Sequence, residues 1–172
     1  SGTISATIPS GTTTGTGYRI RVTATGGLTG TDNGTNLSVN ATGIWIGGAS
    51  GNWEVASNWC GGVPTSTTDV TVPAGVNITI GANASAKSVT ITSTGTLTFA
   101  GAYNLSITSA GSLVNNGTFV ASTGRVVFSG AGGTVSGSSS TTFYNVNISG
   151  GALNLTTQPS INGTLLIGWG GW

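Results

Sequence analysis

The sequence predicts an all-β protein: a right-handed parallel β-helix of about six coils, preceded by the last strands of an immunoglobulin-like sandwich. Short alternating apolar runs separated by Gly, Asn and Ser are the first reason. The second is a loose repeat of about 20 residues from Asp69 onward. The third is composition, with 31 Gly and only 4 % charged residues. No ten-residue stretch escapes Gly, Pro or a β-branched cluster, so no helix is expected.

The repeat, over residues 69–172, consists of two series of strands. The first series starts at Val70, Val89, Leu105, Val126, Val146 and Leu165, at spacings of 19, 16, 21, 20 and 19 residues. A second strand follows each of the first five after 7 to 9 residues, at Ile78, Leu97, Leu113, Val135 and Leu153. Stacked coils would align these side chains in columns, with Val70, Val89 and Leu105 one above another. The alternative is a β-sandwich, whose strands also recur every 8–12 residues or so.

Outward positions of the same strands are expected to be polar. They are Thr71, Thr90, Ser106 and Asn147. The complete outward row would read Thr71, Thr90, Ser106, Val127, Asn147 and Leu166, which is too irregular for an ice-binding surface. Asn-x-Ser/Thr occurs at Asn33, Asn36, Asn40, Asn77, Asn83, Asn104, Asn116, Asn147, Asn154 and Asn162. Alternation of Asn and Thr along strands and turns explains this pattern, and N-glycosylation is the alternative.

Residues 1–42 are interpreted as the C-terminal strands of an immunoglobulin-like β-sandwich, a fragment of that fold. Strands are expected at 4–8, 18–24 and 36–39. A sandwich needs about seven strands, so the others would lie upstream or be supplied by a neighbouring copy. Asp32, Asn33 and Gly34 form a turn signal. A calcium loop there is disfavoured, because further carboxylates are missing nearby.

Residues 43–68 form a tryptophan-rich cap or linker that contains Trp45, Trp53 and Trp59. An open solenoid end exposes core and unpaired strand edges, so large aromatics suit its first coil. The alternative is carbohydrate contact by exposed Trp53, Trp59 and Trp169. Cys60 is the only cysteine. It is either a buried thiol or half of a disulfide whose partner lies elsewhere.

The composition argues against most enzyme classes and several partners. With no His, a His-based triad, a His general base and an ordinary zinc site are excluded. The three carboxylates are far apart in sequence, which disfavours a glycosidase or lyase centre. Net charge is +1 without a basic patch, so nucleic acid is not an expected partner. We predict no catalytic residue, no cofactor, no metal and no transmembrane segment.

Several motifs resemble one group of proteins. The stretch 45–75, with Asn58-Trp59-Cys60-Gly61-Gly62-Val63-Pro64, resembles a module of large surface and secreted proteins of Bacteroidetes. Residues 15–22 resemble the close of their immunoglobulin-like repeats, and 143–148 resemble their β-helical rungs. The resemblance implies multidomain exported adhesins released or anchored by type IX secretion. The sorting domain of such cargo is not visible, and residues 168–172 match no pattern of this kind, which leaves anchoring open.

These observations predict a non-enzymatic structural or adhesive module of an extracellular bacterial surface protein or filament. Its expected partners are other copies or domains of the same protein, and a polysaccharide or other cell-surface ligand. Uncharged surfaces favour association, and exposed coil ends would allow copies to stack into a fibre. The alternatives are a carbohydrate-binding module that uses its tryptophans and, less favoured, a fragment of a β-helical polysaccharide lyase.

Overall fold

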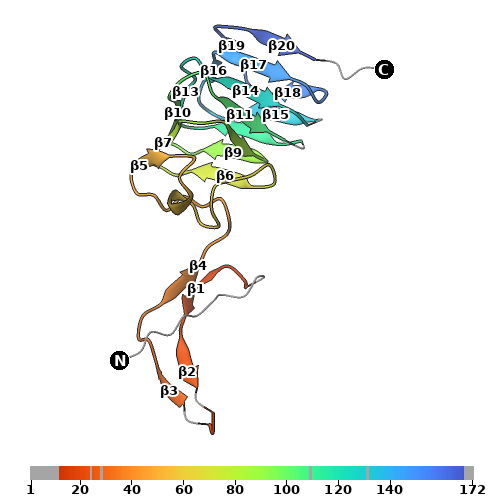
Figure 1. Ribbon diagram of the computed structural model, residues 1–172. Helices are drawn as coiled ribbons and strands as arrows, with labels where there is room; N and C mark the ends of the chain where they lie inside the picture. The colour runs from red at the N-terminus through yellow and green to blue at the C-terminus, as the bar shows by residue number, and fades with distance from the viewer. Residues whose placement is uncertain (1–11, 24, 28, 109, 131, 169–172) are drawn as a thin grey trace. The chain divides into compact units, whose positions relative to one another are not determined.

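The computed structural model describes residues 12–23, 25–27, 29–108, 110–130 and 132–168. The chain divides into two units, Ser1–Ala41 and Thr42–Trp172. The strands of the first unit are β1 (Gly15–Tyr18), β2 (Arg21–Thr23), β3 (Thr29–Asp32) and β4 (Leu37–Val39). Strand β1 pairs antiparallel with β4, and β2 with β3, so the described residues form an interrupted two-stranded hairpin (Figure 1).

The hairpin differs from the predicted strands in two ways. The expected strand over 18–24 is broken between β1 and β2, and β3 was not predicted, because its sequence Thr-Gly-Thr-Asp carries no large apolar residue. Tyr18, Ile20 and Val22 are 38 %, 48 % and 51 % exposed. The expected strand over 4–8 lies outside the described residues. That this hairpin belongs to an immunoglobulin-like sandwich stays a prediction.

The second unit is a β-solenoid, and in its described residues five coils of three strands each follow one another. The first face stacks β6 (Asp69–Val72), β9 (Ser88–Ile91), β12 (Ser112–Asn115), β15 (Gly133–Ser136) and β18 (Leu153–Leu155). The second stacks β5 (Ser50–Asn52), β7 (Asn77–Ile80), β10 (Thr96–Phe99) and β13 (Thr118–Val120); β16 (Thr142–Phe143) and β19 (Ser160–Ile161) are the corresponding strands of the last two coils. The third stacks β8 (Ala84–Ala86), β11 (Asn104–Ile107), β14 (Arg125–Phe128), β17 (Asn145–Ile148) and β20 (Leu165–Ile167).

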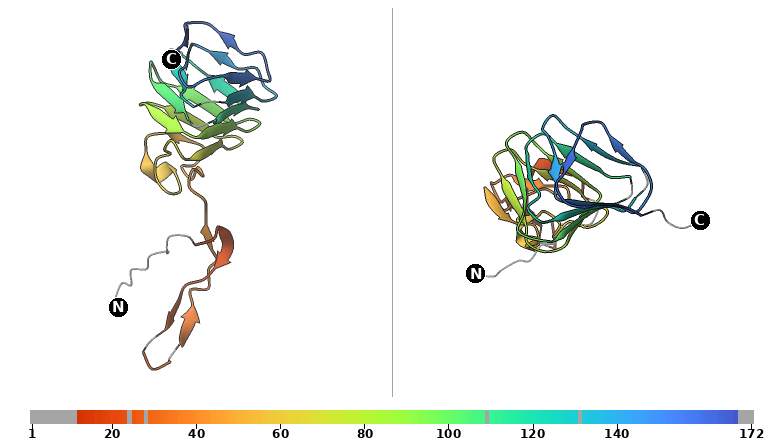
Figure 2. Two further views of the ribbon diagram at one scale, coloured as in Figure 1. Left: turned by 90° about the vertical axis from the view of Figure 1, so that its right-hand side faces the viewer. Right: turned by 90° about the horizontal axis from the view of Figure 1, so that it is seen from above.

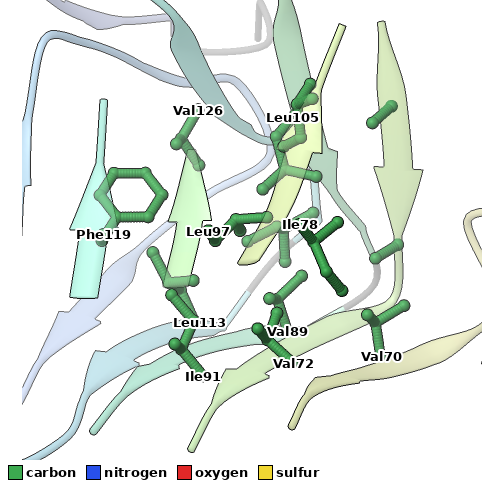
Figure 3. Close-up of a cluster of buried hydrophobic side chains, with 14 of the residues drawn as sticks. Val70, Val72, Ile78, Val89, Ile91, Leu97, Leu105, Leu113, Phe119 and Val126 are labelled. Carbon is green, nitrogen blue, oxygen red and sulfur yellow. The ribbon is translucent and has the colours of Figure 1, made fainter. Parts of the chain in front are cut away.

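All pairs between coils are parallel and in register, so equivalent side chains lie above one another. Figure 2 shows the stack from the side and nearly end-on. The inward columns begin with Val70, Val89, Leu113 and Val135 on the first face, Ile78, Leu97 and Phe119 on the second, and Ala84, Leu105, Val126 and Val146 on the third. These side chains meet in one continuous core (Figure 3). Each buried Val, Leu or Phe contributes about 1.5–3 kcal/mol to stability.

The structure corrects the predicted register. Val89 does lie above Val70, but the next residue of that column is Leu113, and Leu105 instead stacks on Ala84. The prediction that Leu105 shares a column with Val70 and Val89 is therefore wrong, although all three point inward. The coils also number five in the described residues, where about six were expected.

The cause of the error is β8. Its inward residues are Ala84 and Ala86, which give no hydrophobic signal comparable to a Val or Leu run. With β8 hidden, the strands of three faces appear as two series at an 8-residue offset. The larger step from Val89 to Leu113, 24 residues, was masked by Leu105 at 16 residues.

The core contains one buried polar anchor that was not predicted, Asn115 at the end of β12. Its Nδ2 donates to the carbonyl oxygen of Ser140 at 3.0 Å and to Oγ1 of Thr141 at 3.2 Å. The backbone N–H of Gly117 donates to its Oδ1 at 3.2 Å. Asn115 thus binds a loop of the next coil to its own, where the columns below offer Val72 and Ile91.

Replacing Asn115 by Leu is expected to destabilise the solenoid, although it adds an apolar side chain to an apolar column. The change leaves buried backbone and hydroxyl groups without partners, which costs about 1–3 kcal/mol. Urea unfolding of the full chain, followed by circular dichroism, measures the difference. The control is Asn154→Leu on the exposed side of β18, for which we expect a change within about 0.5 kcal/mol. Equal midpoints for the two variants would contradict the anchoring role.

A second close approach is at Gly111, just before β12. A Cβ there would collide with the carbonyl oxygen of Lys87 and lie 2.7 Å from that of Thr108. Both atoms are backbone, so neither can rotate away, and the coils could accept a side chain only by separating.

Gly111→Ala is therefore expected to lower the free energy of unfolding by about 1–3 kcal/mol, the usual cost of overpacking. Gly101→Ala is the matched control, because a Cβ there meets only the Tyr103 ring at an ordinary 3.5 Å. Thermal unfolding of both variants tests this. A Gly111→Ala protein that melts with the wild type would show that the coils separate without cost.

Candidate functional site

The charged side chains of the described residues lie apart and form no reactive centre. Arg19 pairs with Asp32 at 3.1 Å in the hairpin, and Lys87 pairs with Asp69 at 3.2 Å in the solenoid. Both pairs are exposed, and such pairs contribute only about 0–1 kcal/mol. Nowhere in the described chain do three or more Cys, Asp or Glu side chains gather where they could hold a metal ion.

The three tryptophans of the segment 43–68 gather at the first coil. The ring of Trp59 meets Trp45 edge-on at 4.9 Å and Trp53 at 5.0 Å between ring centroids. Trp59 Nε1 donates to the Trp53 carbonyl oxygen, and Trp45 Nε1 to that of Gly48, each at 2.7 Å. Edge-to-face contacts add about 0.5–1.5 kcal/mol per pair beyond burial.

The backbone of this segment is also part of the stack. Strand β5 pairs in parallel with β7, and Ile44 bridges to Thr71 at the edge of β6. The short 3₁₀ helix η1 (Ala56–Asn58) leads to Trp59, which bridges back to Trp45. Segment 43–68 thus covers the first coil with aromatic side chains and at the same time supplies a strand to the second face.

Burial corrects the alternative role for two of these residues. Trp53 and Trp59 are 1 % and 2 % exposed. A sugar stacks on the open face of an aromatic ring, and neither ring has one. The expectation that Trp53 and Trp59 are exposed for carbohydrate contact is therefore wrong. Trp169, the third residue of that expectation, lies outside the described residues.

Cys60 follows Trp59 and is half-buried, so the expectation of a fully buried thiol is wrong. Its backbone N–H donates to the carbonyl oxygen of Ile44 at 2.8 Å, and its carbonyl oxygen accepts from Gly43 at 3.1 Å. This pairing places Cys60 within the backbone of the cap. The alternative of a disulfide to a cysteine elsewhere stays a prediction.

Several asparagines of the Asn-x-Ser/Thr pattern connect coils. Asn83 Oδ1 accepts from the backbone N–H of Asn104 at 2.9 Å, and Asn116 Oδ1 accepts from that of Ser138 at 2.9 Å. These bonds explain why Asn recurs at the same place in the coil without any sugar attached. The predicted outward row is itself a composite, because Thr71 and Thr90 belong to the first face and Ser106 to the third.

Sequence reasoning missed one exposed aromatic pair. Tyr103 and Tyr144 are 36 % and 38 % exposed and directly precede β11 and β17 of the third face. The signal was present, since Tyr103-Asn104-Leu105 and Tyr144-Asn145-Val146 share the pattern Tyr-Asn followed by an apolar residue that points inward. It was overlooked because attention went to the tryptophans.

The far end of the solenoid lacks a counterpart to the tryptophan cap within the described residues. Leu155, Leu165 and Ile167 are 51 %, 48 % and 55 % exposed, although they occupy the inward columns. They had been expected to be buried. A cavity of about 760 Å³, lined by Ile148, Leu153 and residues of the last coil, opens at this end. Their exposure follows from the absence of a described coil above them.

Trp53→Ala tests the importance of the cap. Removing this buried indole is expected to lower the free energy of unfolding by about 3–5 kcal/mol, because the first coil loses its cover and a large cavity is left. The matched control is Tyr18→Ala, an aromatic deletion in the hairpin unit, which should leave the solenoid transition unchanged. Thermal unfolding followed by circular dichroism measures both. A cost below about 1 kcal/mol for Trp53→Ala would contradict the role of the cap.

Comparison with known proteins gives one match. Residues 44–128, just under half of the chain, match a family model described as a domain of unknown function, DUF8693. The matched segment runs from the tryptophan cap to the end of β14 and therefore lies within the second unit. No curated protein and no solved structure matches the chain. The described part of the chain holds no helix whose length and apolar character would let it cross a bilayer.

Proposed function

We propose that this chain is a non-enzymatic structural and adhesive module of an extracellular bacterial surface protein or filament. The observation that carries the proposal is the stack itself. Parallel strands pair without interruption from β6 to β18 on the first face and from β8 to β20 on the third. Solenoids with such ladders are stiff along their axis, because each coil is held by every hydrogen bond of the next.

The outer surface suits a spacer that presents other regions. Only seven charged residues occur in the chain, and the outward positions of the strands are mostly Ser, Thr and Asn. Backbone groups within the faces are used in pairing, which leaves few extended segments open to proteases. A location at the cell surface agrees with this and with the resemblance to exported Bacteroidetes proteins, including their type IX secretion.

The open end of the solenoid supports an interaction with further copies or domains of the same protein. Exposed Leu155, Leu165 and Ile167 and the unpaired edges of β18 and β20 need a cover in water. A following coil or a neighbouring domain would bury them at about 25 cal/mol per Å².

Antibody labelling of intact cells of the source bacterium tests the location and the exposure. We expect labelling without permeabilisation, and loss of the label only after prolonged treatment of the cells with an external protease. Labelling of a periplasmic or cytoplasmic protein serves as the control for intact cells. A signal that requires permeabilisation would overturn the proposal.

A further inference from the structure

We propose that Tyr103, Arg125 and Tyr144 form a binding site for an extended glycan chain that lies along the axis of the solenoid. The site lies at the corner where the second face meets the third. It goes beyond the spacer role, because it gives the module a ligand of defined chemistry. It also differs from the tryptophan platform considered above, whose rings are buried.

The strand register places these residues in two adjacent columns. Asn104, Arg125 and Asn145 are paired successively in β11, β14 and β17. The residue before each of them forms the neighbouring column, since the N–H of Arg125 donates to the Tyr103 carbonyl oxygen at 2.9 Å and that of Asn145 to Gly124 at 3.2 Å. The three strands lie one above another in Figure 1.

The tyrosine column reads Tyr103, Gly124, Tyr144 over three successive coils. At about 4.8 Å per coil, the two tyrosines are about 10 Å apart along the axis. Gly124 adds no side chain between them, and its glycine is required from within, because a Cβ would collide with the ring of Phe99. The Tyr103 ring lies beside Gly101, so nothing larger covers it from that side.

The second column supplies hydrogen-bonding groups without other work. The exposed Arg125 guanidinium makes no hydrogen bond and no ion pair with any described residue. The Asn104 side chain likewise has no hydrogen-bond partner among the described residues. Asn145 Oδ1 accepts from the N–H of Thr164 at 2.9 Å, which leaves its amide N–H₂ directed to other acceptors. A guanidinium and two amides therefore flank the two rings.

A glycan chain matches this arrangement better than other ligands. Pyranose rings present C–H faces that pack on phenol rings, and their rims carry hydroxyls that accept from guanidinium and amide N–H groups. A repeating polymer can place one sugar on each tyrosine and the linking sugar beside Arg125. An acidic peptide would need more than one free cation, and Arg125 is the single unpaired cationic side chain among the described solenoid residues.

Two kinds of glycan share this chemistry, and the test separates them. Neutral probes are cellulose, chitin and a soluble β-glucan, whereas alginate and polygalacturonate carry a carboxylate on each sugar. Binding of the full chain is measured by pull-down for insoluble probes and by affinity electrophoresis for soluble ones. We expect at least one probe to bind. Loss of binding to the acidic probes alone in Arg125→Ala would identify a carboxylate on the bound chain.

Tyr103→Ala and Tyr144→Ala are each expected to weaken binding about tenfold, and the double variant to abolish it. Tyr103→Phe keeps the ring and should retain most of the affinity. Tyr18→Ala is the matched control, since Tyr18 is equally exposed but lies in the hairpin unit. Because both tyrosines of the site are exposed, the variants are expected to melt with the wild type.

Two results would overturn the site. One is failure of all five probes to bind the wild type. The other is binding that Tyr18→Ala reduces as much as Tyr103→Ala does. Neither result bears on the spacer role, because cell-surface labelling measures that role without any glycan.

Discussion

Parallel pairing of every strand with its equivalent in the next coil is the constraint on which the rest of this structure depends. Once β6 pairs with β9 in register, Val89 must lie on Val70 and Thr90 on Thr71. A shift by one residue would turn the whole column outward and expose it. The columns therefore hold the register, and the register in turn fixes the outer rows on which any binding surface is built.

The same constraint explains why the irregular residues lie where they do. The core tolerates few side-chain sizes, so Gly111 and Gly124 occur where backbone or a Phe ring comes close. Asn115 replaces an apolar residue at a point where a loop must be fastened to the coil below. Phe99, Phe119 and Phe143 meet edge-on at 5.9 and 5.6 Å and fill the space beside the small inward residues of β8.

The sequence predicted the class of fold and most inward residues, because Val, Ile and Leu alternate clearly with Thr and Ser. It did not predict the register, since Ala84 and Ala86 are too small to mark a strand. The candidate site was harder to predict. An exposed Tyr and a buried Trp have the same local pattern in sequence, and only the stacking shows that Trp59 faces the core while Tyr103 and Tyr144 share one corner.

The dependence of each coil on its neighbours has a mechanical consequence. Core contacts in a solenoid run mainly to the coil above and the coil below, so stability is nearly a sum of local terms. The tryptophan cluster secures one terminus of the stack, whereas the coil of β18 to β20 has a neighbour on one side only in the described residues. Tension applied at that coil would peel the module open rung by rung, so that it yields gradually and re-zips when the load falls.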